Sequence, residues 1–573
     1  MGTPEKRITY NNLDILTPYE IKHINELRID RKINEHTVLF FSGIIPEEKK
    51  DSYIETASAE DTIEVVQLDE GSKVRNLFKG VVSNICVRCI KGIYYLEAEA
   101  LSYTCIMDIK LIYRSFQNKQ MTYDDLINKV IKGYSGADYK DYAANGSALN
   151  EFTVQYNETD WQFLKRMASR FGAVLVPQVD SDGPKFFFGI PGEKEGSLSE
   201  ELDYTVRKDV SSYLYLSENN VEGLEDFDFA FYEVESSTYL DLGDKVKFLE
   251  KDMVVASSKA EMKSGTMKFI YILAFPNGIK QKRLLNSLIT GAAIEGKVLE
   301  TSSDTVKVHL EIDSEQNAGE ANWFKYATNY TAEGNSGWYV MPQVGDFVKL
   351  YFPNENEDGA VVINSVRKSG ESCPRTADPG IKYFETNYKK HMKSGGKDLI
   401  FTANEGKVFI KLDEENGIEL ESDKPVSLSS EKDFTIDVEK NMIVNAGESI
   451  FFSCNESSSI TMDGMSAETH FQASMVKVEG YKKSAMSLGD VVSMVKDTVM
   501  MPVETVIGLG SMCSAVGKAA ADGTLAQTGL AVVSSLPVVA GAKKVSGMEE
   551  GQGGEEVPIK RGKGKFGLRG VEV

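Results

Sequence analysis

An eight-residue repeat of apolar positions constrains the fold of this chain more than any other feature. From Ile410 onward one position in every eight is apolar, and a second apolar frame follows two residues later. The first frame consists of Ile410, Ile418, Val426, Phe434, Met442 and Ile450; the second consists of Leu412, Leu420, Leu428, Ile436, Val444, Phe452 and then Ile460. In a chain that is 42% hydrophobic, twelve hits in twelve positions of a fixed frame have a probability of roughly 0.00003. The first frame breaks at Ser458.

Each repeat unit is predicted to be a short strand followed by a turn. Polar clusters typical of turns separate the apolar pairs, for example the Gly-containing run at 413–417 and the run at 430–433. Residues two apart on a strand face the same side, so each strand places two apolar side chains on one face. One chain cannot enclose so thin a core. The repeat therefore favours several chains wound around one axis, whereas an antiparallel meander within one chain is the alternative.

The rest of the chain reads as mostly β-structure with two short helices. Residues 8–103 are strand-like, and a second β-rich unit spans about 292–367. Thr122 is the expected cap of a helix that ends near Gly133. A second helix is expected from about Glu158 to Arg170.

Four segments of this sequence resemble VgrG proteins, which are spikes of contractile injection systems, and the related hub and tail spike of contractile phages. The octads resemble the needle of these spikes, and residues 337–346 look like part of their OB-fold. Residues 114–117 and the run that begins at Gln155 are similar to two hub segments. The hub motif in that run comprises Gln155, Tyr156, Glu158, Asp160, Phe163, Leu164 and Arg166.

The resemblance implies a mainly β, multi-domain fold. It predicts a baseplate-hub-like region of two related tube-docking β-barrel subdomains with short helices at 1–285, and an OB-fold at 286–370. A linker at 371–396 and an intertwined, triple-stranded β-helix needle at 397–480 would follow. Residues 481–573 are expected to form an apolar, helical C-terminal extension with a basic tail.

The resemblance also implies a non-enzymatic, structural role. A homotrimer would bind the hexameric inner-tube protein and baseplate or wedge proteins, and a tip cap of the PAAR type or an effector would ride on the needle. The protein would assemble in the bacterial cytoplasm within a phage-tail-like particle. It would contact the target membrane when the sheath contracts.

Composition excludes several other classes. A formal net charge of −22 opposes binding to nucleic acid. Six cysteines in 573 residues do not form a disulfide framework, and the N-terminus lacks the apolar run of a signal peptide. No cofactor is expected.

Motifs that could carry chemistry have simpler explanations. Cys86 and Cys89 have the spacing of half a zinc site, but residues three apart on a strand face opposite sides, which favours packing. The glycine pattern at 562–567 matches a dinucleotide fingerprint without the strand and helix that it requires. The five histidines are scattered, and no catalytic or metal-binding set is predicted. Glu158 and Asp160 are interpreted as carboxylates that favour a helix start.

The extension after about Gly480 leaves two interpretations open. It is uncharged from 505 to 517 and from 523 to 542, and a basic tail follows at 560–569. Apolar helices that cap the spike or bind a partner are the favoured interpretation, and a membrane-active tip or delivered effector is the alternative. A cell-wall hydrolase would need an acid–base or nucleophilic set, which the extension does not show. A free-standing trimeric adhesin would leave the hub-like and OB-like regions without a purpose.

Overall fold

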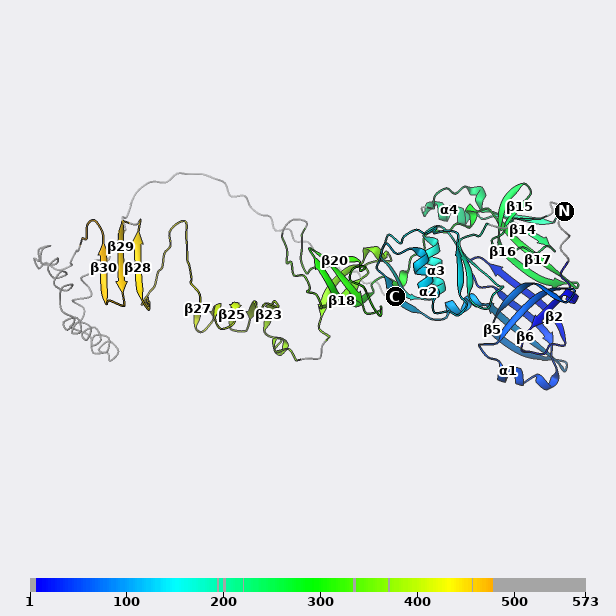
Figure 1. Cartoon of the computed structure of the whole chain (residues 1–573), viewed down its shortest axis with the longest axis horizontal. Coiled ribbons are helices and arrows are strands. Elements are labelled where there is room, and N and C mark those ends of the chain that lie inside the picture. The colour runs from blue at the N-terminus through cyan, green and yellow to red at the C-terminus, as the bar shows by residue number, and fades with distance from the viewer. Residues whose placement is uncertain are drawn as a thin grey trace, which may run out of the picture. The chain divides into compact units, whose positions relative to one another are not determined.

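The computed structural model describes residues 7–192, 195–198, 202–219, 221–332, 336–368, 372–455 and 457–477. The chain divides into two compact units between Asp378 and Pro379, here called unit 1 and unit 2 (Figure 1). In the described residues of each unit most regular elements are β-strands, as the sequence predicts for residues 8–103 and 292–367 and for the octads.

Two sets of strands, one from each end of the hub-like sequence, form a 12-stranded sheet in unit 1. The first set comprises β1 (Leu13–Leu16), β2 (His23–Lys32), β3 (Val38–Ile44), β4 (Thr62–Asp69), β5 (Ser72–Ile90) and β6 (Ile93–Ser102). The second comprises β12 (Glu195–Ser197), β13 (Tyr204–Lys208), β14 (Ala230–Ser236), β15 (Lys245–Phe248), β16 (Lys251–Lys263) and β17 (Thr266–Ala274). Antiparallel pairing of β2 with β16 joins the sets, with Lys32 opposite Ser257. Helix α1 (Ser52–Thr56) lies between β3 and β4 in the sequence, and helix α4 (Val210–Glu218) lies between β13 and β14.

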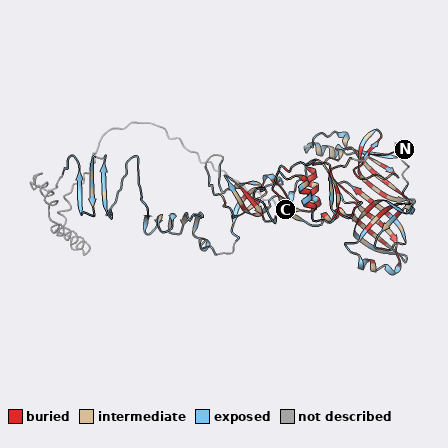
Figure 2. Cartoon of the chain, viewed as in Figure 1, coloured by how far each residue is buried: buried red, intermediate tan, exposed pale blue. Residues whose placement is uncertain are grey.

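Between these strand sets in the sequence lies a smaller module with its own core. Its strands are β7 (Ile112–Phe116), β8 (Asp138–Asp141), β9 (Thr153–Glu158), β10 (Leu175–Pro177) and β11 (Lys185–Phe188), and its helices are α2 (Tyr123–Ile131) and α3 (Asp160–Ser169). Thr122 caps α2 by accepting a hydrogen bond from the Asp125 backbone N–H. Trp161 and Phe163 are fully buried here, so α3 packs its apolar face inward (Figure 2).

A closed five-stranded barrel follows, in the region predicted as an OB-fold. Its order is β18 (Ala293–Ser302), β19 (Thr305–Leu310), β20 (Trp323–Ala327), β22 (Val361–Val366) and β21 (Phe347–Tyr351). The barrel core also receives Phe152 and Val154 from outside the barrel strands, and the Phe152 ring meets Phe324 edge to face at 4.9 Å. The barrel and the small module thus share buried contacts.

Unit 2 contains two antiparallel sheets. The first comprises β23 (Lys382–Glu385), β24 (His391–Ser394), β25 (Asp398–Asn404), β26 (Val408–Asp413) and β27 (Gly417–Ser422); the second comprises β28 (Ser449–Cys454), β29 (Ser458–Asp463) and β30 (Glu468–Gln472). Strands β23 and β24 lie within the residues predicted as a linker, so the non-strand connection is shorter than predicted. The described residues 423–448, which hold three octads, form no helix or strand.

The C-terminal extension predicted at 481–573 lies outside the described residues. Within the described part of the chain, no helix is long and apolar enough to cross a membrane.

Candidate assembly sites

The first site is one face of the β23–β27 sheet, here called the repeat face. In the β26–β27 hairpin Ile410 pairs with Leu420, and Leu412 pairs with Ile418. Paired residues and residues two apart share a face of a sheet, so all four side chains lie on the repeat face. In this hairpin the two apolar frames therefore lie on a single surface, as the spacing predicts.

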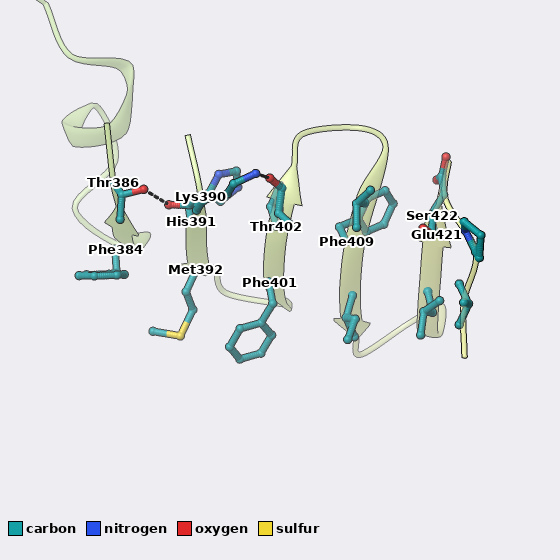
Figure 3. Close-up of a pocket in the computed structure, with 16 residues that line it drawn as sticks. Phe384, Thr386, Lys390, His391, Met392, Phe401, Thr402, Phe409, Glu421 and Ser422 are labelled. Atoms are coloured by element: carbon teal, nitrogen blue, oxygen red, sulfur yellow. Dashed lines mark hydrogen bonds between the residues drawn. The ribbon is translucent and has the colours of Figure 1, made fainter. Parts of the chain in front are cut away.

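The repeat face extends upstream of the octads. Phe401 pairs with Ile410, Met392 pairs with Phe401, and Phe384 pairs with Met392, so one apolar row crosses all five strands. Figure 3 shows Phe384, Met392 and Phe401 side by side on neighbouring strands. This row borders an apolar groove of about 600 Å³. The periodicity of the octads does not indicate these three residues, because they precede the regular spacing of eight.

The second sheet of unit 2 continues the pattern after a shift of two residues. Ile450 pairs with Met462 and Phe452 pairs with Ile460, while Phe471 extends the row onto β30. Ser458, where the first frame breaks, is the first residue of β29 and lies outside the apolar pair. The pair is therefore Ile460 and Met462. The pairing of β28 with β29 is shifted by two residues relative to that of β26 with β27, and the apolar face resumes in this new register.

The repeat residues are poorly covered in the single chain. Twelve of the thirteen are exposed and Ile450 is half-buried; the exposed ones are Ile410, Leu412, Ile418, Leu420, Val426, Leu428, Phe434, Ile436, Met442, Val444, Phe452 and Ile460. Leu428 retains 75% of its exposure and Ile418 77%. So many exposed large apolar side chains are typical of an interaction site. The strands of both sheets pair antiparallel within one chain. This is the antiparallel meander, the alternative to several chains wound around one axis. The multichain needle remains a prediction.

The second site is the hub motif, which lies at the contact between α3 and the barrel. Arg166 donates from Nε and Nη2 to the two carboxylate oxygens of Glu158, both at 2.8 Å. Its Nη1 lies 3.0 Å from Glu357 of the barrel turn η7 (Glu357–Gly359). Arg170 approaches the other Glu357 oxygen at 3.0 Å. Burial lowers the pKa of Arg166, but the Glu357 and Glu158 carboxylates outweigh it and raise that pKa overall.

A second polar set, around Asp160, fixes the start of α3. Asp160 accepts hydrogen bonds from Gln155 Nε2 at 3.0 Å and from the Tyr134 hydroxyl at 2.7 Å, and it pairs with Arg114. Burial and the bond to Asp160 raise the pKa of Tyr134. The interpretation of Glu158 and Asp160 as helix-start carboxylates holds for the position of Asp160, which lies in the first turn of α3, but neither carboxylate caps the helix. The capping group is the Thr159 hydroxyl, which accepts from the Gln162 N–H at 3.2 Å, while both carboxylates bind distant side chains.

Phe163 and Leu164 of the hub motif pack within the core of the small module, whereas Tyr156 packs against the barrel core. Phe163 and Leu164 are fully buried, and Phe163 stacks on Phe116 with ring centroids 5.6 Å apart. Tyr156 meets Tyr113 edge to face at 5.2 Å. These contacts join the two predicted hub segments, because β7 and β9 pair antiparallel.

The strand β7 segment also reaches the barrel directly. The Ser115 backbone N–H donates to Asp313 at 2.7 Å, and Gln117 Nε2 donates to the Val308 carbonyl at 3.0 Å. Gln117 Oε1 in turn accepts from the Asn322 N–H at 3.2 Å. Sequence alone could not find these partners, since about two hundred residues separate them from Ser115 and Gln117.

The two sites described above consist of exposed apolar rows and of buried paired charges. Across the described residues, no group of three or more histidine, cysteine or acidic side chains could hold a metal ion. Cys86 and Cys89 are exposed on β5, opposite Glu97 and Tyr94. The glycine pattern at 562–567 lies outside the described residues.

Comparison with known proteins identifies the hub region. Residues 65–185 match the family model of the phage tail baseplate hub (GPD). This range contains both predicted hub segments, so the hub resemblance is confirmed there. No curated protein sequence matches the chain.

Solved structures that match parts of this chain include secretion and tail proteins. One is the Escherichia coli c3393 protein, a component of the type VI secretion system, with 12% identity, coverage of 62% of this chain and 99% of that chain, and a TM-score of 0.44. Another is the Francisella PdpA–VgrG complex, half-lidded, with 9% identity, coverage of 71% and 87%, and a TM-score of 0.46. A third is a tail protein of Neisseria meningitidis MC58, with 13% identity, coverage of 47% and 98%, and a TM-score of 0.35.

Proposed function

We propose that this chain is the trimeric spike and hub at the tip of a contractile injection machine. The hub would nucleate the inner tube and the baseplate, and the needle would puncture the target envelope when the sheath contracts. The observation that carries the proposal is the exposed double row of apolar side chains in unit 2, in a chain whose residues 65–185 match a baseplate hub.

The energetics of the repeat favour several chains over one. Each apolar side chain that moves from water into a core contributes about 1.5–3 kcal/mol. Twelve such side chains remain exposed in the single chain, and a threefold arrangement would supply each of them with equivalents from two neighbours. Residues 423–448 would then gain the strand partners that they lack within the single chain.

The contacts between hub and barrel support a role in transmitting force. The charged groups of this junction are buried and paired on both sides of the contact, and the barrel core receives Phe152 and Val154 directly. Such a junction resists rotation better than a flexible linker does. Force applied along the needle would therefore pass from the barrel into the hub without a hinge.

The 12-stranded sheet is the proposed docking surface for the hexameric inner-tube protein. Two strand sets per chain would give three chains six similar positions, which matches a hexameric partner. Baseplate or wedge proteins would bind around the hub, and a PAAR-type cap or an effector would bind at the needle tip. Assembly would take place in the bacterial cytoplasm.

The mass and shape of the purified full-length chain test this proposal. Native mass spectrometry should give three times the mass of 63.4 kDa, and electron micrographs should show an elongated particle with a thin rod. The rod should disappear in a variant truncated after residue 396, while the hub remains. A full-length protein that stays monomeric at micromolar concentration would contradict the spike.

A further inference from the structure

The repeat contains a second periodic pattern, made of charges. An acidic residue followed by a lysine stands three and two positions before the first-frame residue in three successive octads. These doublets are Asp423–Lys424, Glu431–Lys432 and Glu439–Lys440. The octads on either side have Glu415–Asn416 and Gly447–Glu448 at the same positions, so the pattern is confined to the middle of the repeat.

The doublets coincide with the part of unit 2 that has no strand pairing. All six side chains lie in the described segment 423–448 and are exposed. Within the described residues, no ion pair joins any of them to another group. The octads that do pair within the chain, in β26–β27 and β28–β29, lack the lysine of the doublet.

The structure also shows what a charge at this position can do. Glu415 occupies the acidic position of the preceding octad, in the turn between β26 and β27, and it pairs with Lys397. Lys397 belongs to the turn between β24 and β25, at the same end of the sheet because Leu399 pairs with Leu412. An acid in one turn thus reaches a lysine in the turn stacked beside it.

The apolar repeat leaves a problem of register that these charges can solve. Because both apolar frames recur every eight residues, a chain shifted by one octad against its neighbours keeps nearly all of its apolar contacts. Burial of the apolar side chains therefore contributes nearly the same free energy in each of these registers. A non-repeating element has to select one, as buried polar residues and flanking charges do in coiled coils.

We infer that the three doublets form an ion-pair ladder between copies of this chain, in which the acid of one copy pairs with the lysine of its neighbour and sets their register. The inference rests on the proposed needle. In the correct register every lysine faces an acid of the neighbouring copy. After a slip of one octad, one doublet faces Glu415–Asn416 or Gly447–Glu448, which removes pairs and places acids together.

Charge reversal with two differently tagged copies tests the ladder. The acidic variant carries Lys424→Glu, Lys432→Glu and Lys440→Glu; the basic variant carries Asp423→Lys, Glu431→Lys and Glu439→Lys. Each variant alone should form trimers about tenfold more slowly than the wild type at low salt, since like charges then stack. Coexpression should restore assembly in part and give mainly mixed trimers by native mass spectrometry, because two of the three interfaces in a mixed trimer pair opposite charges and only one pairs like charges. At 1 M salt, where the screening length falls to about 3 Å, the defect of each single variant should shrink.

A matched control separates the ladder from net charge. Lys49→Glu, Lys132→Glu and Lys325→Glu change the charge by the same amount at exposed sites of unit 1, and this variant should assemble like the wild type. If each reversed variant assembles alone at the wild-type rate and shows no preference for mixing, the ladder is wrong while the trimeric needle stands. If the wild type itself is not a trimer, the proposed function fails first.

Register has its own readout. A variant with all six charges neutralised, by lysine and glutamate to glutamine and Asp423→Asn, should still trimerise through its apolar rows. Cross-links between its chains should then join residues whose numbers differ by eight as well as equivalent residues. Cross-links between equivalent residues alone would contradict a role in register.

Discussion

The hub–barrel half of the molecule and the repeat use similar apolar residues in opposite ways. In unit 1 side chains such as Trp161 and Phe163 are fully buried by the same chain. In unit 2 Phe434 and Leu428 remain 64% and 75% exposed. A region that encloses its own core can fold alone, whereas a region whose apolar rows stay exposed requires partners. Unit 1 therefore buries its own core, whereas the repeat residues of unit 2 would be buried only in an assembly.

The sharpest way to break this contrast is a carboxylate on the repeat face. Leu420→Asp should abolish trimer formation, because symmetry would bury three carboxylates together without partners. The thermal unfolding of unit 1 should not change. Native mass spectrometry and the melting curve of the full-length variant measure the two effects.

Ile443→Asp is the matched control for that variant. Ile443 is 79% exposed and lies between the two frames, so its side chain should face away from the repeat rows. This control should assemble normally. A trimeric Leu420→Asp protein with unchanged stability would show that the repeat face is not the interior of an assembly.

The next largest effect is expected at the buried ion network of unit 1. Glu357→Ala removes the carboxylate that both Arg166 and Arg170 contact, and should destabilise unit 1 by about 3–5 kcal/mol because two buried arginines each lose one of their carboxylate partners. Urea unfolding followed by tryptophan fluorescence measures this, since Trp161, Trp323 and Trp338 all belong to unit 1.

Lys119→Ala provides the comparison at the same turn. Lys119 pairs with Asp358 at 2.8 Å, but both side chains are more than one third exposed. Removing this pair should cost only ~0–1 kcal/mol, because water solvates the charges that remain. Equal losses in the two variants would mean that the Glu357 network is not what holds barrel and hub together.

The smallest effect should arise at a helix cap. Thr122→Ala removes the hydroxyl that accepts from the Asp125 N–H and should destabilise unit 1 by about 1 kcal/mol. Thr122→Ser keeps the oxygen and should be nearly neutral. Neither variant should alter the trimer mass. A change in the trimer mass of either variant would show that the stability of unit 1 and the assembly of unit 2 are not independent.

Local patterns in the sequence predicted local structure well. Thr122 and the apolar spacing after it located α2, and the octads placed Ile410, Leu412, Ile418 and Leu420 on one face. Both predictions rest on interactions within a few residues or on the period of a strand.

The sequence does not predict contacts between distant segments. Nothing near Arg166 indicates that its partner is Glu357, and nothing near Glu158 indicates that its carboxylate binds an arginine instead of the helix start. Pairing of β2 with β16 likewise joins residues more than two hundred positions apart. These pairs form only when unit 1 packs as a whole. No periodic pattern in the sequence indicates them.

The position of Phe152 and Val154 in the barrel core has a practical consequence for protein engineering. The two residues come from the hub-like sequence, yet a barrel excised at residue 286 would lose them and open an apolar hole. Exchange of modules between spikes should therefore cut the chain between Asp378 and Pro379, where the two compact units divide. A chimera that grafts a foreign needle at that point keeps hub and barrel as one inherited part.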